Sequence, residues 1–137
     1  MGTFRITAQV GSLTGDRLQP VELLVDTGAS YTQVPASFLQ RLGVLPRARR
    51  RFRLADGRQI ELEIGQARIQ LDGDEGITVV VFGPDGAGAV LGAVTLEELG
   101  LAVDPLNQRL VPVEGLLMTT QHPLRANGEM PAPFMSC

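Results

Sequence analysis

The sequence has few of the residues that would point to several common kinds of protein. It has no tryptophan and a single tyrosine among 137 residues, so we expect an aliphatic core of leucine, valine and isoleucine. The only cysteine, Cys137, cannot form a disulfide within the chain, which favours a reducing compartment or a bacterial cytoplasm. The only histidine, His122, stands beside a proline in a segment without a sustained pattern. A Cys–His or Ser–His catalytic pair therefore has little support.

Neither the net charge nor the apolar runs indicate a nucleic-acid or membrane partner. The formal net charge is -3, which gives no reason to expect binding to nucleic acid or to an anionic membrane. The longest apolar run, residues 77–82, is far shorter than a bilayer requires. The first residues lack the pattern of a signal peptide. We expect a soluble, cytoplasmic protein.

One segment is strongly positive although the net charge of the chain is negative. Five arginines fall among the seven residues 47–53, and such a run can bind an acidic partner or nucleic acid. Because the overall charge is negative and Phe52 is the only aromatic residue in the run, a solvated strand is the favoured interpretation. No spacing of cysteine, histidine or carboxylates indicates a metal site, and we expect no metal and no cofactor. Asp72, Asp74 and Glu75 fit a hairpin turn better than a calcium loop.

Most of the chain is patterned as short strands separated by turns. Apolar residues alternate over 4–10, which is typical of a strand with one buried face. Residues 21–26 are so continuously apolar that a strand buried on both faces is predicted. Three hairpins are also predicted: one with a two-residue turn at Asp56-Gly57, one turning over 72–76, and one bending around 104–108.

Two short helices interrupt the strands. Residues 35–43 begin with proline and end with glycine, the usual asymmetry of helix ends. In the second helix, 95–100, Thr95 and Glu98 are predicted to form a capping box. The fold class expected is therefore all-β, or β-rich with two short helices.

The domain is expected to end before the chain does. Residues 1–113 carry all the strand and helix patterns, whereas 114–137 have no sustained period and contain three prolines. We expect a single domain over 1–113 and a C-terminal tail over 114–137, which is either flexible or in contact with a dimer partner.

The stretch LLVDTGAS, residues 23–30, carries the strongest chemical signal. An apolar strand runs directly into Asp26, Thr27 and Gly28. A carboxylate beside apolar surface is costly unless it is hydrogen-bonded or used, and the end of a rigid strand is where a catalytic carboxylate is well held. An ordinary Asx-turn would give the same tripeptide, so these residues alone leave both readings open. Residues 89–94 repeat the pattern of an apolar stretch meeting a glycine.

Taken in order, these motifs resemble the retroviral-type, or retropepsin-like, aspartic proteases, and in particular their small bacterial relatives. The matching motifs are Asp26-Thr27-Gly28-Ala29, Thr32 to Pro35 before a short helix, Val90-Leu91-Gly92 before a second helix, residues 54–65 where the family carries its flap, and residues 99–113 as a closing hairpin. The resemblance covers about residues 4 to 113. It implies the acid-protease fold, a closed β-barrel.

The resemblance also implies a homodimeric aspartic endopeptidase that acts on peptides or proteins. The reaction needs two carboxylates about 3 Å apart that share one proton. Because the chain has one Asp-Thr-Gly, Asp26 of each subunit of a C2 dimer must supply them. Catalytic roles are expected for Asp26, Thr27 and Gly28. Contacts with substrate are expected from Ala29, Ser30, Ala55, Asp56, Gly57, Arg58, Leu91 and Gly92.

The chain departs from the viral pattern at several positions. Ser30 stands where viral relatives usually carry an aspartate, Ala93-Val94 stand where a polar or basic pair is usual, and the flap lacks dense glycines. These departures keep one alternative: a catalytically silent dimeric module that holds an extended peptide by β-addition. The intact Asp-Thr-Gly favours the enzyme, because a pure binder has no reason to bring two like carboxylates together.

Overall fold

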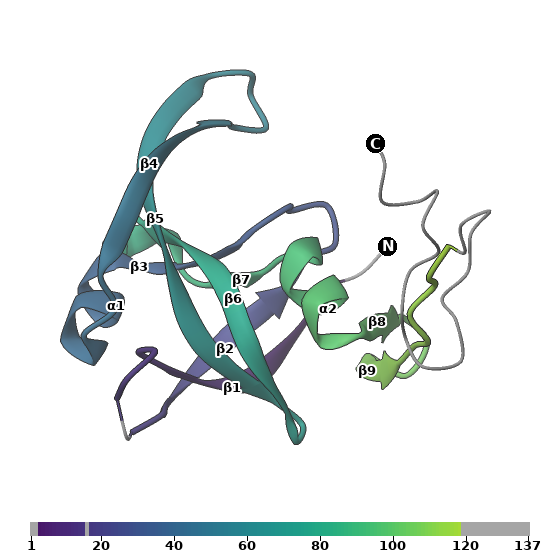
Figure 1. The fold of residues 1–137 in the computed structure, drawn as a ribbon. Helices are drawn as coiled ribbons and strands as arrows, with labels where there is room; N and C mark the ends of the chain where they lie inside the picture. Colours follow the sequence, from purple (N-terminus) through teal and green to yellow (C-terminus); the bar gives the residue numbers. More distant parts are fainter. Residues whose placement is uncertain (1–2, 16, 119–137) are drawn as a thin grey trace, which may run out of the picture.

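Figure 1 shows the fold in a computed structural model, which describes residues 3–15 and 17–118. Strands dominate the described residues, with two short helices and one 3-10 turn. The elements in chain order are β1 (Phe4–Gly11), β2 (Gln19–Val25), β3 (Thr32–Pro35), α1 (Ala36–Leu42), β4 (Pro46–Arg53), β5 (Gln59–Leu71), β6 (Asp74–Gly83), η1 (Asp85–Ala87), β7 (Val90–Leu91), α2 (Ala93–Leu99), β8 (Leu101–Asp104) and β9 (Arg109–Pro112).

Seven of the described strands form one sheet, in the order β1-β2-β7-β3-β6-β5-β4. β1 also pairs with β5, antiparallel, through Gln9, Val10 and Gly11. This extra pairing links β1, β2, β7, β3, β6 and β5 into a closed circuit and leaves β4 outside it. The β4–β5 hairpin therefore extends beyond the body of the sheet, where it arches over the loop between β2 and β3 (Figure 1).

The core is aliphatic, as the composition predicted. Among the buried apolar side chains of the described residues, Phe82 is the only aromatic one. The alternation in β1 is also confirmed, because Ala8 and Val10 are buried and Phe4 and Ile6 pack against the same core. Burying this aliphatic surface is the main force that holds the strands together.

The prediction that residues 21–26 are buried on both faces is wrong. Leu23 and Val25 are buried, whereas Leu24 is only partly covered and Glu22 is exposed. β2 lies between β1 and β7 within the sheet, so only one of its faces packs on the core.

Two of the predicted turns differ from the observed ones. The β4–β5 hairpin closes with three loop residues, Ala55 to Gly57, because Leu54 pairs with Arg58 and the Gly57 N–H donates to the Leu54 carbonyl at 2.9 Å. The β5–β6 hairpin has the two-residue turn, at Asp72-Gly73, with φ of 48° and 89°. Positive φ at both positions is the turn type that matches strand twist.

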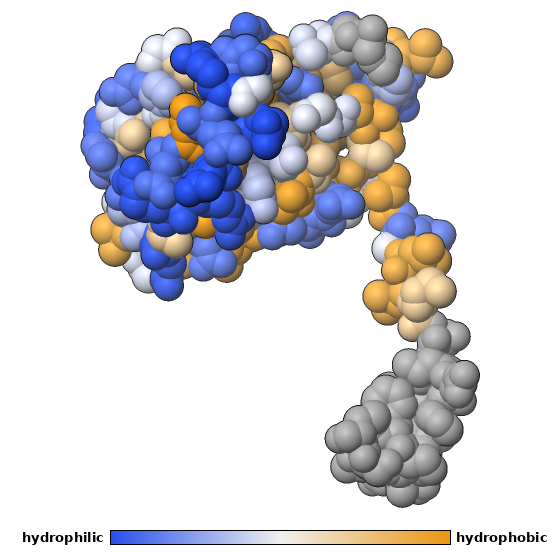
Figure 2. Space-filling model, turned by 90° about the horizontal axis from the view of Figure 1, so that it is seen from above, coloured by the Kyte–Doolittle hydropathy of each residue, from blue (hydrophilic) through white to orange (hydrophobic). Residues whose placement is uncertain are grey.

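The described chain ends in an extended segment. The last regular element stops at Pro112, and Leu116, Leu117 and Met118 are 87%, 90% and 84% exposed. Figure 2 shows these hydrophobic residues projecting from the body. The remainder of the predicted tail, including His122 and Cys137, lies outside the described residues. No helix in the described part of the chain is long and apolar enough to cross a membrane.

Candidate active site

Asp26 stands at the carboxyl end of β2, at the start of a tight loop. Its N–H donates to the Leu91 carbonyl of β7 at 3.2 Å, and its carbonyl accepts from the Ala29 N–H at 3.0 Å. One carboxylate oxygen accepts from the Gly28 N–H at 3.0 Å. This is the Asx-turn that the sequence left open, and it holds a half-buried carboxylate at a fixed place. Thr27 and Gly28 are exposed beside it.

The second glycine motif supports this loop from behind. The loop carbonyls of Ala29 and Ser30 accept from the N–H groups of Ala93 and Val94, each at 2.9 Å. A Cβ on Gly92 would lie 2.5 Å from the Tyr31 carbonyl carbon, so only glycine allows this approach. The first N–H groups of α2 are therefore satisfied by the Asp26 loop rather than by a side chain.

The predicted capping box of Thr95 and Glu98 is consequently wrong. α2 begins at Ala93, two residues earlier than predicted, and its N-cap is Gly92 with no side-chain cap. Both side chains bond elsewhere: Thr95 Oγ1 lies 2.6 Å from Thr32 Oγ1 and 2.7 Å from Thr78 Oγ1. Tertiary partners thus displace the local arrangement that the spacing suggested.

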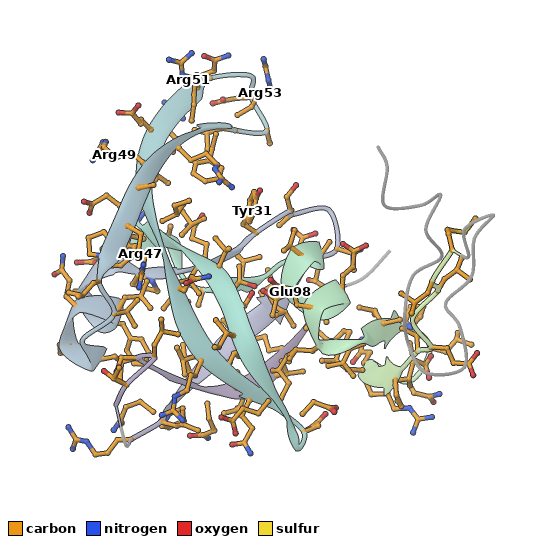
Figure 3. The ribbon with its side chains drawn as sticks, viewed as in Figure 1. Tyr31, Arg47, Arg49, Arg51, Arg53 and Glu98 are labelled. Atoms are coloured by element: carbon orange, nitrogen blue, oxygen red, sulfur yellow. The ribbon has the colours of Figure 1, made fainter. Side chains whose placement is uncertain are left out.

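These side chains form one directed chain of hydrogen bonds, which ends on Glu98 of α2. Glu98 is labelled in Figure 3. A carboxylate only accepts, so Thr78 donates its single hydroxyl proton to Glu98 at 2.6 Å. Thr95 must then donate to Thr78, and Thr32 to Thr95. Thr32 in turn accepts from the Gly92 N–H at 3.1 Å. Every hydroxyl in the chain donates once and accepts once, which fixes the two glycine motifs relative to each other.

A groove of about 410 Å³ lies between this loop and the β4–β5 hairpin. Gly28, Ala29 and Ser30 line its floor, and Phe52 and Leu62 belong to the hairpin side. Two of the predicted substrate contacts, Ala29 and Ser30, therefore line this groove.

Tyr31 joins the hairpin to the loop, and sequence reasoning missed it. The Arg50 guanidinium donates to the Tyr31 hydroxyl at 2.8 Å and lies over its ring, 5.3 Å from the centroid. Phe52 meets the same ring edge-on at 5.9 Å. Strand alternation could have placed Arg50 and Phe52 on one face, but nothing local in the sequence indicates Tyr31 as their partner.

The other predicted substrate contacts are divided between the tip of the hairpin and the interior. Ala55, Asp56, Gly57 and Arg58 are exposed at the tip, where Asp56 and Arg58 form an ion pair at 2.7 Å. Leu91 is 0% exposed. Gly92 is also buried, and its neighbours are loop backbone atoms. Leu91 and Gly92 are thus packed inside the chain, and neither lines the groove.

Asp26 also lines a second hollow, of about 450 Å³, on the other side of the loop from the hairpin. Thr3 and Phe4 of the N-terminal segment and Val103 and Pro105 of the β8–β9 hairpin complete its wall. A larger cavity, of about 510 Å³ between α1 and the segment before β2, contains none of the predicted site residues. No cluster of three or more histidine, cysteine or carboxylate side chains suited to a metal ion occurs among the described residues.

Comparison with known proteins decides the family. Residues 16–98, more than half of the chain, match the sequence model of the family described as "gag-polyprotein putative aspartyl protease". The chain belongs to this family. The matched segment includes the Asp26 loop, the β4–β5 hairpin and nearly all of α2. No curated protein matched the chain.

Two solved structures show that the chain has the retropepsin-like fold. A retropepsin-like aspartic protease from Rickettsia conorii superposes with a TM-score of 0.54 at 23% identity, covering 76% of this chain and 78% of that one. The EIAV protease in complex with the inhibitor HBY-793 superposes with a TM-score of 0.52 at 19% identity, covering 80% and 93%. The fold predicted from the motifs is thereby confirmed.

Proposed function

We propose that two copies of this chain form an aspartic endopeptidase, with Asp26 of each copy in a shared active site. The observation that carries the proposal is the placement of Asp26. Its loop is held from inside by β7 and α2, while Thr27 and Gly28 remain exposed beside it. The chain contains a single Asp-Thr-Gly, and the chemistry requires two carboxylates. A symmetric partner placed against the exposed side of the loop would supply the second.

The proposed reaction follows from two carboxylates that share one proton. The ionised Asp26 takes a proton from a water molecule between the pair, and the protonated one donates a hydrogen bond to the scissile carbonyl oxygen. Water adds to the carbonyl carbon to give a gem-diol. The dyad then protonates the leaving nitrogen, and the C–N bond breaks.

The surrounding residues take supporting roles in this proposal. Thr27 braces the two loops across the dimer, and Gly28 leaves room for the substrate backbone. Ala29 and Ser30 contact the peptide in the groove, and the hairpin tip from Ala55 to Arg58 covers it and excludes water. We assign Leu91 and Gly92 to holding the loop in place, in line with their burial.

A pair of matched substitutions tests the proposal. Asp26→Asn keeps the size of the side chain and removes its acid–base chemistry, so cleavage of a denatured protein substrate should fall by at least about a hundredfold. Asp72→Asn makes the same chemical change at an exposed hairpin turn with φ of 48°, which asparagine tolerates, and activity should be unchanged. Retained activity in Asp26→Asn would refute the mechanism. Binding of peptide without cleavage by the unaltered dimer would favour the silent binding module instead.

Mixing the two proteins tests the shared site. If each active site needs Asp26 from both chains, adding excess Asp26→Asn protein draws unaltered chains into inactive heterodimers. Activity per unaltered chain should then fall to about half at equal amounts and toward zero at large excess. Activity that is independent of the added variant, under conditions where the chains exchange, would show that one copy is sufficient.

A further inference from the structure

The groove between the Asp26 loop and the β4–β5 hairpin has a positively charged wall. Arg51 and Arg53 of β4 are among the residues that line it, whereas none of its lining residues in the described chain is an aspartate or a glutamate. Residues 46–65, which contain β4 and the first part of β5, include six arginines and three carboxylates, although the chain as a whole has a net charge of -3. Positive charge is thus concentrated beside the groove.

Arg51 and Arg53 have no acidic partner within the described residues, and the strand register explains why. Glu61 of β5 lies opposite Arg51, and Gln59 lies opposite Arg53. Glu61 instead accepts a hydrogen bond from Arg49 at 3.0 Å, and Gln59 is neutral. Neither Arg51 nor Arg53 forms an ion pair with any residue in the described ranges. Two guanidinium groups at the groove therefore remain available to a carboxylate from outside the chain.

These two guanidinium groups stand at the rim of the groove rather than on its floor. Figure 3 shows the side chains of Arg51 and Arg53 extending from the outer side of the hairpin, away from Tyr31, and both residues are exposed. Much of the remaining lining is apolar and is half-buried or buried: Phe52, Leu54, Ile60, Leu62 and Val81. The groove therefore combines apolar walls with a positively charged rim.

We propose that the groove selects peptides in which an acidic residue adjoins an apolar one, a preference that rests on the proposed protease function and names its substrate class. Neighbouring side chains of an extended peptide point to opposite faces. An apolar side chain can therefore lie against Leu62 and Val81 while the next residue brings a carboxylate to Arg51 or Arg53. A guanidinium group suits this partner because it donates two parallel hydrogen bonds to one carboxylate.

A peptide fits this lining better than a single strand of nucleic acid does. Grooves for single strands combine basic residues with aromatic rings on which bases stack. Tyr31 and Phe52 line the groove, but the Arg50 guanidinium already lies over the Tyr31 ring, 5.3 Å from its centroid, and Phe52 packs edge-on against the same ring at 5.9 Å. The other apolar lining residues are aliphatic, which suits amino-acid side chains and offers no surface for stacking.

Fluorescence anisotropy with full-length protein tests the preference without requiring cleavage. All proteins carry Asp26→Asn, and the probes are three fluorescein-labelled octapeptides, Thr-Thr-X-Leu-Leu-X-Thr-Thr, with glutamate, glutamine or lysine at both X positions. The glutamate peptide should bind about threefold to tenfold more tightly than the glutamine peptide, as expected for two exposed ion pairs. The lysine peptide should bind more weakly than the glutamine peptide, and about 0.5 M salt should bring the three affinities together.

Charge reversal at the rim makes the test specific to these residues. Arg51→Glu combined with Arg53→Glu should invert the order, so that the lysine peptide binds more tightly than the glutamate peptide. Loss of folding cannot produce such an inversion, and the milder pair Arg51→Gln with Arg53→Gln should remove the order instead. The matched control is Arg17→Glu with Arg41→Glu, which changes the net charge equally at two exposed arginines that line a different cavity. The original order should persist in this control.

Cleavage of the same peptides by protein with intact Asp26 separates this preference from the protease proposal. The glutamate peptide should have the highest kcat/KM, and the difference should lie in KM, because a contact at the rim is equally strong in the ground and transition states. The predicted order of affinities without any cleavage would support the preference and refute only the proposed reaction.

Three results would overturn the preference even if every peptide were cleaved. The first is equal affinity for the glutamate, glutamine and lysine peptides. The second is an unchanged order after Arg51→Glu and Arg53→Glu. The third is displacement of the glutamate peptide by an equal concentration of a ten-nucleotide oligothymidine, which would assign the charged rim to nucleic acid instead.

Discussion

Replacing Thr95 by valine should test whether the buried chain of hydroxyls holds the Asp26 loop in place. Thr95 is 0% exposed, and its hydroxyl lies 2.6 Å from that of Thr32 and 2.7 Å from that of Thr78. Valine has nearly the same shape, so the change removes two hydrogen bonds without opening a cavity. The hydroxyl proton of Thr32 then loses its acceptor, and Thr78 loses its donor.

The expected loss in the free energy of unfolding follows from these two hydrogen bonds. Each contributes about 1 kcal/mol net, and leaving buried partners unsatisfied adds to the loss, so the free energy of unfolding should fall by about 2–3 kcal/mol. For a domain of this size that corresponds to a decrease in Tm of about 6–12 °C. Urea unfolding should be measured at one protein concentration, because association would make stability depend on concentration.

Two further substitutions make the measurement decisive. Thr95→Ser keeps the hydroxyl and loses only a methyl group, so it should cost about 1 kcal/mol. Thr7→Val changes an exposed threonine of β1 and should stay within about 0.5 kcal/mol of the unaltered protein. If Thr95→Val were as stable as the unaltered protein, or more stable than Thr95→Ser, the directed chain would contribute nothing and the reasoning would be refuted.

Two other predictions concern a glycine and a carboxylate. Gly92→Ala would place a Cβ 2.5 Å from the Tyr31 carbonyl carbon, which should cost about 1–3 kcal/mol and lower kcat/KM by displacing the loop. Gly86→Ala, with open space around its Cβ, should do neither, and equal effects in both would contradict this account. At Asp104 a hydrogen bond from the Asn107 side chain is the largest influence that holds the pKa of the carboxyl below its usual range. The stability it contributes is present above the unfolded-state pKa of about 3.9 and is lost as pH falls through the lower folded-state pKa. Asp104→Asn should therefore flatten the acid limb of the stability-versus-pH curve, and an unchanged slope would argue against this role.

Local sequence rules located the hairpins of this chain but did not determine their turns. Asp56-Gly57 and Asp72-Gly73 are the same dipeptide between strands, yet the first belongs to a three-residue loop and the second forms the two-residue turn. The pairing of the flanking strands decides between them. The single strand β5, from Gln59 to Leu71, belongs to both hairpins. Its registers with β4 and β6 depend on pairing along the whole strands and not on the turn dipeptide.

The motifs predicted the family and a turn at Asp26, because Asp26, Thr27 and Gly28 are adjacent in sequence. Contacts between separate elements leave no comparable pattern in the sequence. Tyr31 and Arg50 meet only because the β4–β5 hairpin arches over the loop. The composition shows that the chain has a single tyrosine, but it does not show which residues that tyrosine contacts.

The failed capping box shows where local and tertiary preferences diverge in this protein. Thr95 and Glu98 have the spacing that caps a helix, and both would be free to do so if α2 were isolated. In the folded chain the loop carbonyls of Ala29 and Ser30 already accept the first N–H groups of the helix. The two side chains are thereby released to bond with Thr78 and Thr32, residues from other strands. A helix whose first N–H groups are bonded to the Asp26 loop has no need of a side-chain cap, so breakdown of the local rule at this position is itself a sign that α2 supports this loop.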